Sequence, residues 1–310
     1  MAGTKLRFVV SLITEDNDYQ REQASAAQQA AGILGVDLQV CFANNDAIEQ
    51  SMQILNAIQT INARVDGILV EPASRTAFPK VAHAAAASGI AWVVLNAEAE
   101  YLKELRLVAK VPVFSVGADN QQVGRIQGQQ LAALLPCGGC VLYIQGPSNS
   151  SVVEPRAAGM LETKPEGVSI KTLKSANWTE DGGYRTVSSW LSLSTSRNER
   201  IDAVQGQNDF LAMGARRALE HETAGEERES RIQVPFLGVD GLANTGQAWV
   251  RQGSLTATVV VPPTAGQALE TLVGALGNQS QPPEQTLVSS HSLPELKALA
   301  AKANAPPQND

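Results

Sequence analysis

The amino-acid sequence predicts an α/β protein made of two doubly wound, parallel-sheet lobes joined by a multi-strand hinge. The first observation is a regular alternation between short apolar runs and longer amphipathic stretches along most of the chain. The second is that many of the apolar runs lack a polar face, as expected of parallel strands covered by helices on both sides. The third is their number, because about ten strands are too many for one small doubly wound sheet and suit two lobes.

The candidate strands follow one another at intervals that leave room for a helix between them. In chain order they are residues 5–12, 37–42, 66–70, 90–95, 113–117, 140–146, 168–173, 201–206, 234–239 and 255–261. The clearest intervening helix has apolar residues at steps of three and four, which predicts one buried stripe. The residues of this stripe are Ile48, Met52, Leu55, Ile58, Ile61 and Val65.

The chain is expected to pass between the two lobes three times. The first passage is expected near residues 116–119, and the second at residues 259–263, where two prolines stop a strand and Thr264 can cap the next helix. A final strand at about residues 286–293 offers the third. The predicted N-terminal lobe is residues 1–117 plus 262–285, the C-terminal lobe is residues 118–261 plus 286–302, and residues 303–310 form a disordered tail.

Composition and charge exclude several classes of protein. The 310 residues are 44% hydrophobic, which predicts a packed globular protein, and the net charge is −7. Because phosphate contacts need clustered Lys and Arg, no nucleic-acid partner is expected. The apolar run after Lys5 is interrupted by Arg7 and is too short for a signal peptide or a membrane span. The expected location is therefore periplasmic or otherwise extracytoplasmic if a leader has been removed, and cytoplasmic if not.

Three cysteines are too few for a disulfide framework. Cys137 and Cys140 form a C-x-x-C pair, which is typical of redox or metal sites, but neither a second pair nor a nearby histidine completes a zinc shell. The favoured interpretation is a glycine-rich turn before a strand, with a small local disulfide as the alternative.

Sequence motifs of the common enzyme classes are missing. The chain lacks the glycine-rich nucleotide loops, the G-x-S-x-G nucleophile motif and the H-E-x-x-H zinc motif. Its histidines, His83, His221 and His291, are far apart in the sequence. We therefore predict no catalytic residue, no metal site and no cofactor.

Polar and aromatic residues instead follow the carboxyl ends of the candidate strands, where open α/β sheets bind ligands. Each has an alternative role: Asn17 and Asp209 could cap helices, and Arg156 or Asp240 could form surface ion pairs. Together, however, their types suit a sugar, because carboxylates and amides pair with hydroxyls and an aromatic ring covers the apolar face of a sugar. The set is Asn17, Asp18, Tyr19, Gln20, Glu71, Ser74, Arg75, Asn96, Arg156, Trp178, Asn208, Asp209 and Asp240.

Six segments in a fixed order carry a resemblance to a known family. They are residues 11–35, 66–77 (DGILVEPASRTA), 115–132, 141–159, 203–219 (AVQGQNDFLAMGARRAL) and 236–241 (FLGVDG). In this series the chain resembles type I periplasmic binding proteins of the ribose and galactose-binding cluster, whose fold is shared with the effector-binding core of lactose-repressor-type regulators.

The resemblance implies roles for individual residues. Asn17 and Tyr19 match a ligand-contacting Asn and aromatic residue, Arg156 the sugar-binding Arg, Trp178 the ring-stacking aromatic, Asn208 the Asn of a Q-N-D motif, and Asp240 the Asp of a G-x-D-G motif. Asn96 and Glu71 stand where ribose binders have Asp and Asn. Ala97 replaces an Arg, and Val261 lies near the position of a pocket Gln, which argues against ribose itself. With Asp18, the predicted ligand-binding set is Asn17, Asp18, Tyr19, Glu71, Asn96, Arg156, Trp178, Asn208 and Asp240.

The implied function is capture of a small polar ligand, such as a sugar or polyol, by hinge closure, without chemistry on the ligand. The implied partner is a membrane ABC permease, and the protein is expected to be a monomer. One alternative is the effector-binding core of a transcription regulator or sensor. Another is an α/β enzyme in which Asp18, Glu71 or Asp240 acts as a general acid or base.

Overall fold

The computed structural model describes residues 5–60, 64–74, 76, 78–97 and 99–303. They divide into two compact units. The first unit runs to Ala118 and also contains Asn149–Ser151 and Pro263–Val288; the second contains Asp119–Ser148, Val152–Pro262 and the chain from Ser289 onward. Each unit has one six-stranded sheet.

The sheet of the first unit has the strand order β11-β5-β4-β3-β1-β2, and all its neighbouring strands are parallel. Because β1 lies between β2 and β3, the strand order reverses beside β1, and this topological switch point is where such sheets bind ligands. The strands are β1 (Arg7–Leu12), β2 (Asp37–Phe42), β3 (Gly67–Val70), β4 (Ala91–Leu95), β5 (Val113–Ala118) and β11 (Gln285–Val288).

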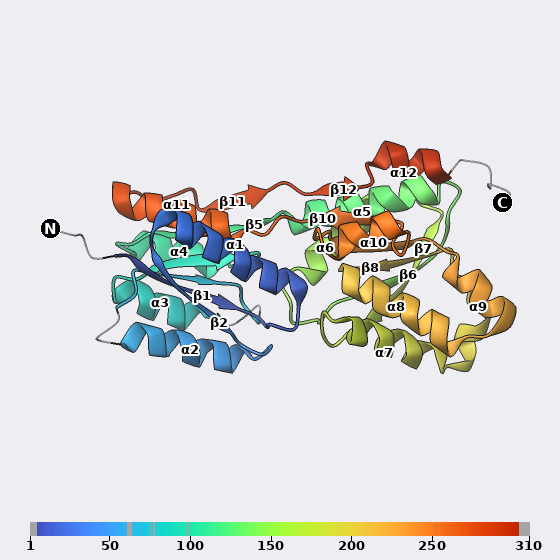
Figure 1. Cartoon of the computed structure of the whole chain (residues 1–310), viewed down its shortest axis with the longest axis horizontal. Helices are drawn as coiled ribbons and strands as arrows, with labels where there is room; N and C mark the ends of the chain where they lie inside the picture. The colour runs from blue at the N-terminus through green and yellow to red at the C-terminus, as the bar shows by residue number, and fades with distance from the viewer. Residues whose placement is uncertain (1–4, 61–63, 75, 77, 98, 304–310) are drawn as a thin grey trace. The chain divides into compact units, whose positions relative to one another are not determined.

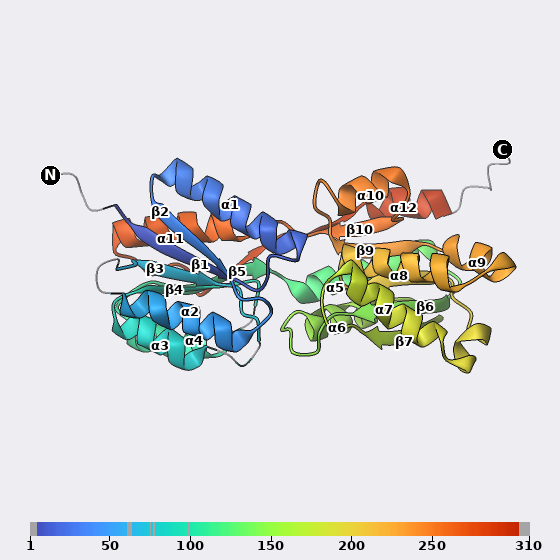
Figure 2. The same ribbon diagram turned by 60° about the horizontal axis from the view of Figure 1, so that its bottom comes forward.

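Helices cover both faces of this sheet, as Figures 1 and 2 show. One face packs against α1 (Asp18–Leu34) and α11 (Ala265–Asn278), and the other against α2 (Ala47–Gln59), α3 (Pro79–Ala87) and α4 (Tyr101–Val108). Strands β3 and β4 are buried at every residue because both faces are covered.

The second unit repeats the arrangement, with the strand order β12-β10-β9-β8-β6-β7. Its switch point lies between β6 and β8, and only β12 runs antiparallel to its neighbour β10. The strands are β6 (Gly139–Gln145), β7 (Val168–Lys174), β8 (Ala203–Gly206), β9 (Phe236–Asp240), β10 (Ala257–Val260) and β12 (His291–Leu293).

Helices of the second unit also form two layers around its sheet. Residues of α7 (Glu180–Leu191) and α8 (Asp209–Glu222) belong to one core, and residues of α5 (Asn120–Leu134), α6 (Val153–Thr163) and α12 (Leu296–Ala303) pack on the other side. The shorter α9 (Gly225–Ile232) and α10 (Gly246–Gln252) complete the unit (Figure 1).

The prediction of two doubly wound parallel sheets is confirmed, and every candidate strand forms. The expected final strand at 286–293 is instead two strands: β11 pairs with β5 in the first sheet, and β12 pairs with β10 in the second. Residues 286–288 therefore belong to the first unit, not to the C-terminal lobe as predicted. Ala303 ends α12, and the rest of the predicted tail lies outside the described residues.

Three local predictions have different outcomes. The buried stripe on α2 was wrong for Ile48 and Met52, which are 73% and 58% exposed, because the helix turns Gln50 and Ile54 toward the sheet. Ile61 lies outside the described residues. The predicted glycine turn before β6 is confirmed, and the described cysteines are free thiols.

Candidate functional site

In each unit, polar side chains gather at the carboxyl ends of the strands around the switch point. We call the set Tyr19, Gln23, Glu71, Asn96 and Thr264 the first polar edge. The set Asn120, Arg156, Trp178, Gln207, Asn208, Asp209 and Asp240 is the second polar edge.

Glu71 and Asn96 are the centre of the first polar edge. They directly follow β3 and β4, and each is 8% exposed. Asn96 Nδ2 donates to Tyr19 Oη at 3.2 Å and to Glu71 Oε2 at 3.4 Å. Gln23 Nε2 donates to the same Glu71 oxygen at 3.2 Å. The structure thus brings together the three predicted residues Tyr19, Glu71 and Asn96.

Gln23 connects this group to the start of α11. Its Oε1 accepts from the backbone amides of Thr264 and Ala265, both at 2.8 Å, so Gln23 rather than Thr264 caps the helix. Thr264 occupies the N-cap position of α11, as predicted, but its side chain does not cap the helix, because its hydroxyl donates to Asn96 Oδ1 at 3.3 Å. None of the five members of the first polar edge is cationic, so within this set Glu71 accepts from neutral amides.

Two other predicted residues, Asn17 and Asp18, have local structural roles at the start of α1. Asn17 Oδ1 accepts from the backbone amide of Gln20 at 3.2 Å, which is the capping role weighed from the sequence. Asp18 pairs with Arg21 one turn along the helix. Ligand binding by these two residues stays a prediction. For Asn17 the predicted contact is through the side-chain amide nitrogen, because the Oδ1 atom already accepts from Gln20.

Arg156 is fixed from two sides within the second polar edge. It lies on α6, is 7% exposed, and donates through Nε to Asn120 Oδ1 at 3.0 Å and through Nη1 to the Gln207 carbonyl at 2.7 Å. The alternative of a surface ion pair was therefore wrong. A guanidinium held in this way is oriented before any ligand arrives, which reduces the ordering cost of binding.

Trp178 lies over the end of β6. A Cβ at Gly146 would be 2.2 Å from Trp178 Cη2, so only glycine leaves room for the indole there. The Trp178 carbonyl accepts from Asn208 Nδ2 at 2.9 Å. The ring is partly buried, which leaves part of it accessible for contact. Asn208 also caps α8, because its Oδ1 accepts from the Leu211 amide at 2.8 Å.

Asp240 ends β9, and Asp209, the first residue of α8, interacts electrostatically with it. Asp240 is 8% exposed and has a φ of 103°, a conformation that favours glycine. Asp209 is fully enclosed; burial and then the neighbouring Asp240 raise the pKa of Asp209 well above the ordinary value, while hydrogen bonds from Thr258 and Gly241 and the charge of Arg156 act in the opposite direction.

Several members of the two edges were missed by the sequence analysis: Gln23, Thr264 as a hydrogen-bonding partner, Asn120 and Gln207. Gln207 accepts from the Gly146 amide at 3.1 Å and donates to Tyr143 Oη at 3.0 Å and the Val153 carbonyl at 2.8 Å. Its place directly before Asn208 was the available signal. Arg75, which was considered from the sequence, lies outside the described residues.

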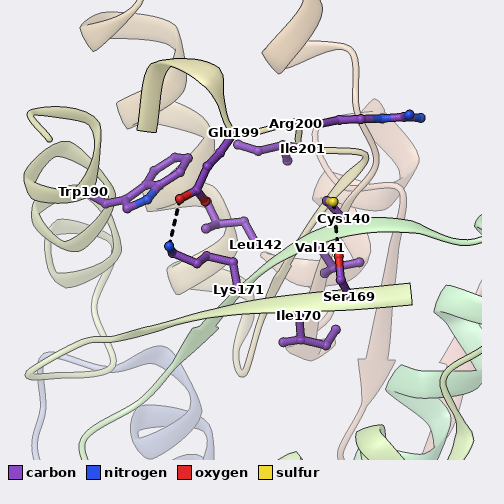
Figure 3. Close-up of a pocket in the computed structure, with 10 residues that line it drawn as sticks. All are labelled: Cys140, Val141, Leu142, Ser169, Ile170, Lys171, Trp190, Glu199, Arg200 and Ile201. Carbon is purple, nitrogen blue, oxygen red and sulfur yellow. Dashed lines mark hydrogen bonds and ion pairs between the residues drawn. The ribbon is translucent and has the colours of Figure 1, made fainter. Parts of the chain in front are cut away.

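A cavity of about 260 Å³ lies elsewhere in the second unit (Figure 3). Its lining includes Cys140 and Ser169, near the starts of β6 and β7, and Ile201, just before β8. Figure 3 shows Lys171 directed toward Glu199, with an Nζ to Oε1 distance of 2.9 Å. This cavity is at the amino ends of the strands, opposite the second polar edge.

Comparison with known proteins identifies the family of this chain. Residues 8–280 match the periplasmic binding protein domain. The chain is 30% identical over 258 residues to a xylitol-binding protein of Mycolicibacterium smegmatis, covering 83% of this chain and 66% of that protein. It is 30% identical over 198 residues to a D-ribose/D-allose-binding protein of Pseudomonas aeruginosa, covering 64% of this chain and 58% of that protein. The chain thus spans less than two thirds of the length of these curated relatives.

A solved structure extends the similarity to the fold. An ABC transporter periplasmic solute-binding protein from Actinobacillus succinogenes with bound D-allose has a TM-score of 0.80, 22% identity, and coverage of 96% of this chain and 100% of that one. Among the described residues, no helix is both long and apolar enough to cross a membrane. The fold, the two polar edges and the match over residues 8–280 together establish that the chain belongs to the periplasmic binding protein domain family, whose members are binding proteins.

Proposed function

We propose that this chain is a solute-binding protein that captures a small sugar or polyol and performs no chemistry on it. The observation that carries the proposal is that both sheets have buried polar side chains at the carboxyl ends of the strands around the switch point, where such sheets bind ligands. The ligand contacts both polar edges, and because contacts from both units favour a closed state, binding shifts the protein toward closure.

The chemistry of the two edges supports a polyhydroxylated ligand. Glu71, Asn96 and Asp240 offer oxygen acceptors for hydroxyl protons, whereas Arg156 offers donors for hydroxyl oxygens. Trp178 offers a flat apolar face, which suits the C–H face of a sugar ring. Polar groups placed on a partly apolar wall are the usual composition of a small-molecule site.

The balance of charge supports a neutral or amine-bearing ligand. Glu71 and Asp240 are buried carboxyl groups, whereas the two edges contain one cation, Arg156. A phosphorylated sugar would need more cationic partners and would be repelled by the carboxylates. The relatives that bind xylitol, D-ribose or D-allose support the same neutral class. Ala97 and Val261 support a ligand other than ribose.

The family also supports a role in uptake. We propose that the protein works outside the cytoplasmic membrane as a monomer and delivers its ligand to an ABC permease. The similarity to an ABC transporter periplasmic solute-binding protein supports this role.

A thermal-shift screen tests the proposal. The panel contains D-allose, D-ribose, D-xylose, xylitol, myo-inositol, D-glucosamine and D-ribose 5-phosphate. A ligand that binds only the native state raises the melting temperature. At a concentration of 100 times its Kd, it adds about 2.7 kcal/mol to the free energy of unfolding. We expect a rise with at least one neutral or amine-bearing member and no rise with the phosphate.

The ligand is recovered after overnight incubation and analysed by NMR. We expect it to be chemically unchanged. Conversion of the bound ligand would contradict the absence of chemistry. A melting-temperature rise with the sugar phosphate alone would contradict the ligand class.

A further inference from the structure

Asp209 is a buried carboxyl residue that interacts electrostatically with Asp240 and is 1% exposed. It is the first residue of α8, next to the cap residue Asn208. Its Oδ2 accepts from the Gly241 backbone amide at 2.8 Å, and its Oδ1 accepts from the Thr258 hydroxyl at 2.6 Å. The carboxylate therefore joins α8 to the residue after β9 and to β10.

The surrounding backbone leaves room for this carboxylate and for little else. A Cβ at Gly238 would lie 2.1 Å from Asp209 Oδ1, and a Cβ at Gly246 would lie 2.0 Å from Oδ2. Any side chain at either glycine would displace Asp209. Burying a charge without partners is costly, so a fully enclosed carboxylate needs hydrogen-bond donors. Asp209 has two donors and lies between two glycines, which indicates that the fold is built to hold it.

Asp240 has a backbone conformation that needs support from its neighbours. Its φ of 103° costs on the order of 1–3 kcal/mol for a residue other than glycine. The peptide group that follows this strained residue is held at both of its polar atoms. Its carbonyl, that of Asp240, accepts from the Val261 amide at 3.0 Å, and its N–H, that of Gly241, donates to Asp209.

We propose that Asp209 is a positioning residue that holds Asp240 in its strained conformation and thereby sets the contact of Asp240 with the ligand. The part of this inference that concerns the contact between Asp240 and the ligand rests on the proposed function. The part that concerns the backbone conformation of Asp240 does not. Asp209 is too deeply buried to contact a ligand itself.

The charges around Asp209 give this role a pH dependence. Burial and Asp240 on β9 raise the pKa of Asp209, and Arg156 on α6 opposes the rise. As the pH falls through this raised pKa, the carboxylate gains a proton and becomes a weaker acceptor for the Gly241 amide. An asparagine at this position keeps an oxygen for Gly241 and an amide group for the Thr258 hydroxyl, but does not titrate.

The first experiment measures the Gly241 amide by NMR and needs no ligand. We compare hydrogen exchange and the pH dependence of the amide shift in wild type, Asp209→Asn, Asp209→Ala and the isosteric Thr258→Val. Asp202→Asn is the matched control, because Asp202 also accepts a backbone amide, that of Cys140 at 2.7 Å, at the opposite end of the sheet.

We expect Gly241 to exchange at least about tenfold faster in Asp209→Ala than in wild type. In Asp209→Asn the exchange stays within about threefold of wild type, but the shift loses its titration. In Thr258→Val the exchange rate of Gly241 lies between those of wild type and Asp209→Ala. In Asp202→Asn the Gly241 shift depends on pH as it does in wild type. Unchanged exchange in Asp209→Ala overturns the proposal. If that variant fails to fold, a Gly241 shift that titrates equally in Asp209→Asn and wild type overturns it.

The second experiment measures the Kd of D-allose and xylitol by calorimetry from pH 5 to pH 8. For Asp209→Ala, which loses the bond to Gly241, we expect at least about fivefold weaker binding. For Asp209→Asn, which keeps that bond but does not titrate, we expect a flatter pH profile than in wild type. An unchanged profile overturns the link between Asp209 and the ligand. If no member of the sugar panel binds wild type, the proposed function fails, while the Gly241 measurement still decides the backbone role.

Discussion

The two units have the same strand order but contrasting polar edges. The first edge is built from amides, hydroxyls and one carboxylate, Glu71, which accepts from Gln23 and Asn96. The second edge contains a guanidinium, Arg156, and two adjacent carboxylates, Asp209 and Asp240. The same fold thus brings different side-chain chemistry to corresponding places in the two sheets, which is why we argue the proposed binding site from its side chains rather than from the fold.

The difference also concerns how firmly each edge is held. Neutral hydrogen bonds of 3.2 and 3.3 Å connect Asn96 with Tyr19 and Thr264 in the first edge. The second edge has a charge-assisted bond of 2.7 Å from Arg156, an indole lying on Gly146 and a strained Asp240. Because charge-assisted bonds are about twice as strong as neutral ones, we expect the second edge to contribute most of the affinity.

The largest expected effect is that of Arg156→Ala on ligand affinity. Removing a buried donor set leaves ligand hydroxyls and the Gln207 carbonyl unpaired, so we expect a loss of at least about 2 kcal/mol, or roughly 30-fold in Kd. Calorimetry with the tightest ligand of the panel measures it. Arg125→Ala is the control, because Arg125 forms an exposed pair with Glu162.

The melting temperature of the unliganded Arg156→Ala protein shows whether the fold survives. A loss of affinity below about threefold, or roughly 0.65 kcal/mol, in a folded variant would remove Arg156 from the site. A fall of the same size in Arg125→Ala would point to a general effect of charge.

Trp178→Ala is expected to have the next largest effect. Truncating an aromatic residue that contacts a ligand typically costs about 1–3 kcal/mol, and Trp178→Phe should retain part of this because it keeps a flat face. Fluorescence provides a second measurement, since Trp92 and Trp190 are buried in the two cores. Trp249, which packs edge-on against Phe210, gives the control variant Trp249→Phe.

If Trp178 covers the ligand, the emission change on titration should disappear in Trp178→Phe and persist in Trp249→Phe. The same emission change in both variants would show that Trp178 does not report binding. Unchanged affinity in Trp178→Ala would place the ring outside the site.

On the first edge, Glu71→Gln sharpens the comparison by removing charge while keeping shape. Binding of an amine-bearing ligand should weaken about tenfold, or roughly 1.4 kcal/mol, whereas a neutral analogue should change less than about threefold. Calorimetry with a sugar and its amino derivative measures both. Glu49→Gln, at a partly exposed glutamate on α2 that accepts from Asn44, is the control. Equal losses for the two ligands would mean that Glu71 acts only as a hydrogen-bond acceptor.

The sequence predicted the strands well because burial on both faces leaves a continuous apolar run, as in β3 and β4. It also predicted the edge at which the polar groups gather, because parallel strands end together. It did not predict the exposed Ile48, since periodicity gives the spacing of a stripe but not the face that the sheet covers.

Hydrogen-bond partners were harder to predict than positions. The sequence does not show that Gln23 would cap α11, because Gln23 and Thr264 are separated by 241 residues along the chain. Nor does it show that Trp178 would lie on Gly146, since nothing in the spacing of the two residues indicates contact. Both arise from tertiary packing. Candidates at the carboxyl ends of strands, such as Glu71 after β3, were accessible to sequence reasoning because the strand itself places them.

The smallest expected effect is that of Asp209→Asn on the pH dependence of the free energy of unfolding. It concerns the two carboxyl groups of the second edge, Asp209 and Asp240, which have no counterpart in the first edge. Because the pKa of Asp209 is raised on folding, the native state binds more protons than the unfolded state between the ordinary and the raised values. The stability that the protonated form contributes is present at about pH 4 and is lost as the pH rises through the raised pKa. Asp209→Asn does not titrate, so the difference in free energy of unfolding, wild type minus variant, should fall as the pH rises from about 4 to about 7. Urea unfolding at each pH measures this difference, in which groups such as Asp37, whose pKa is lowered by Lys5, cancel because both proteins contain them. A difference that stays constant or rises with pH would show that Asp209 is ionised over the whole range and that the proton of the pair resides elsewhere.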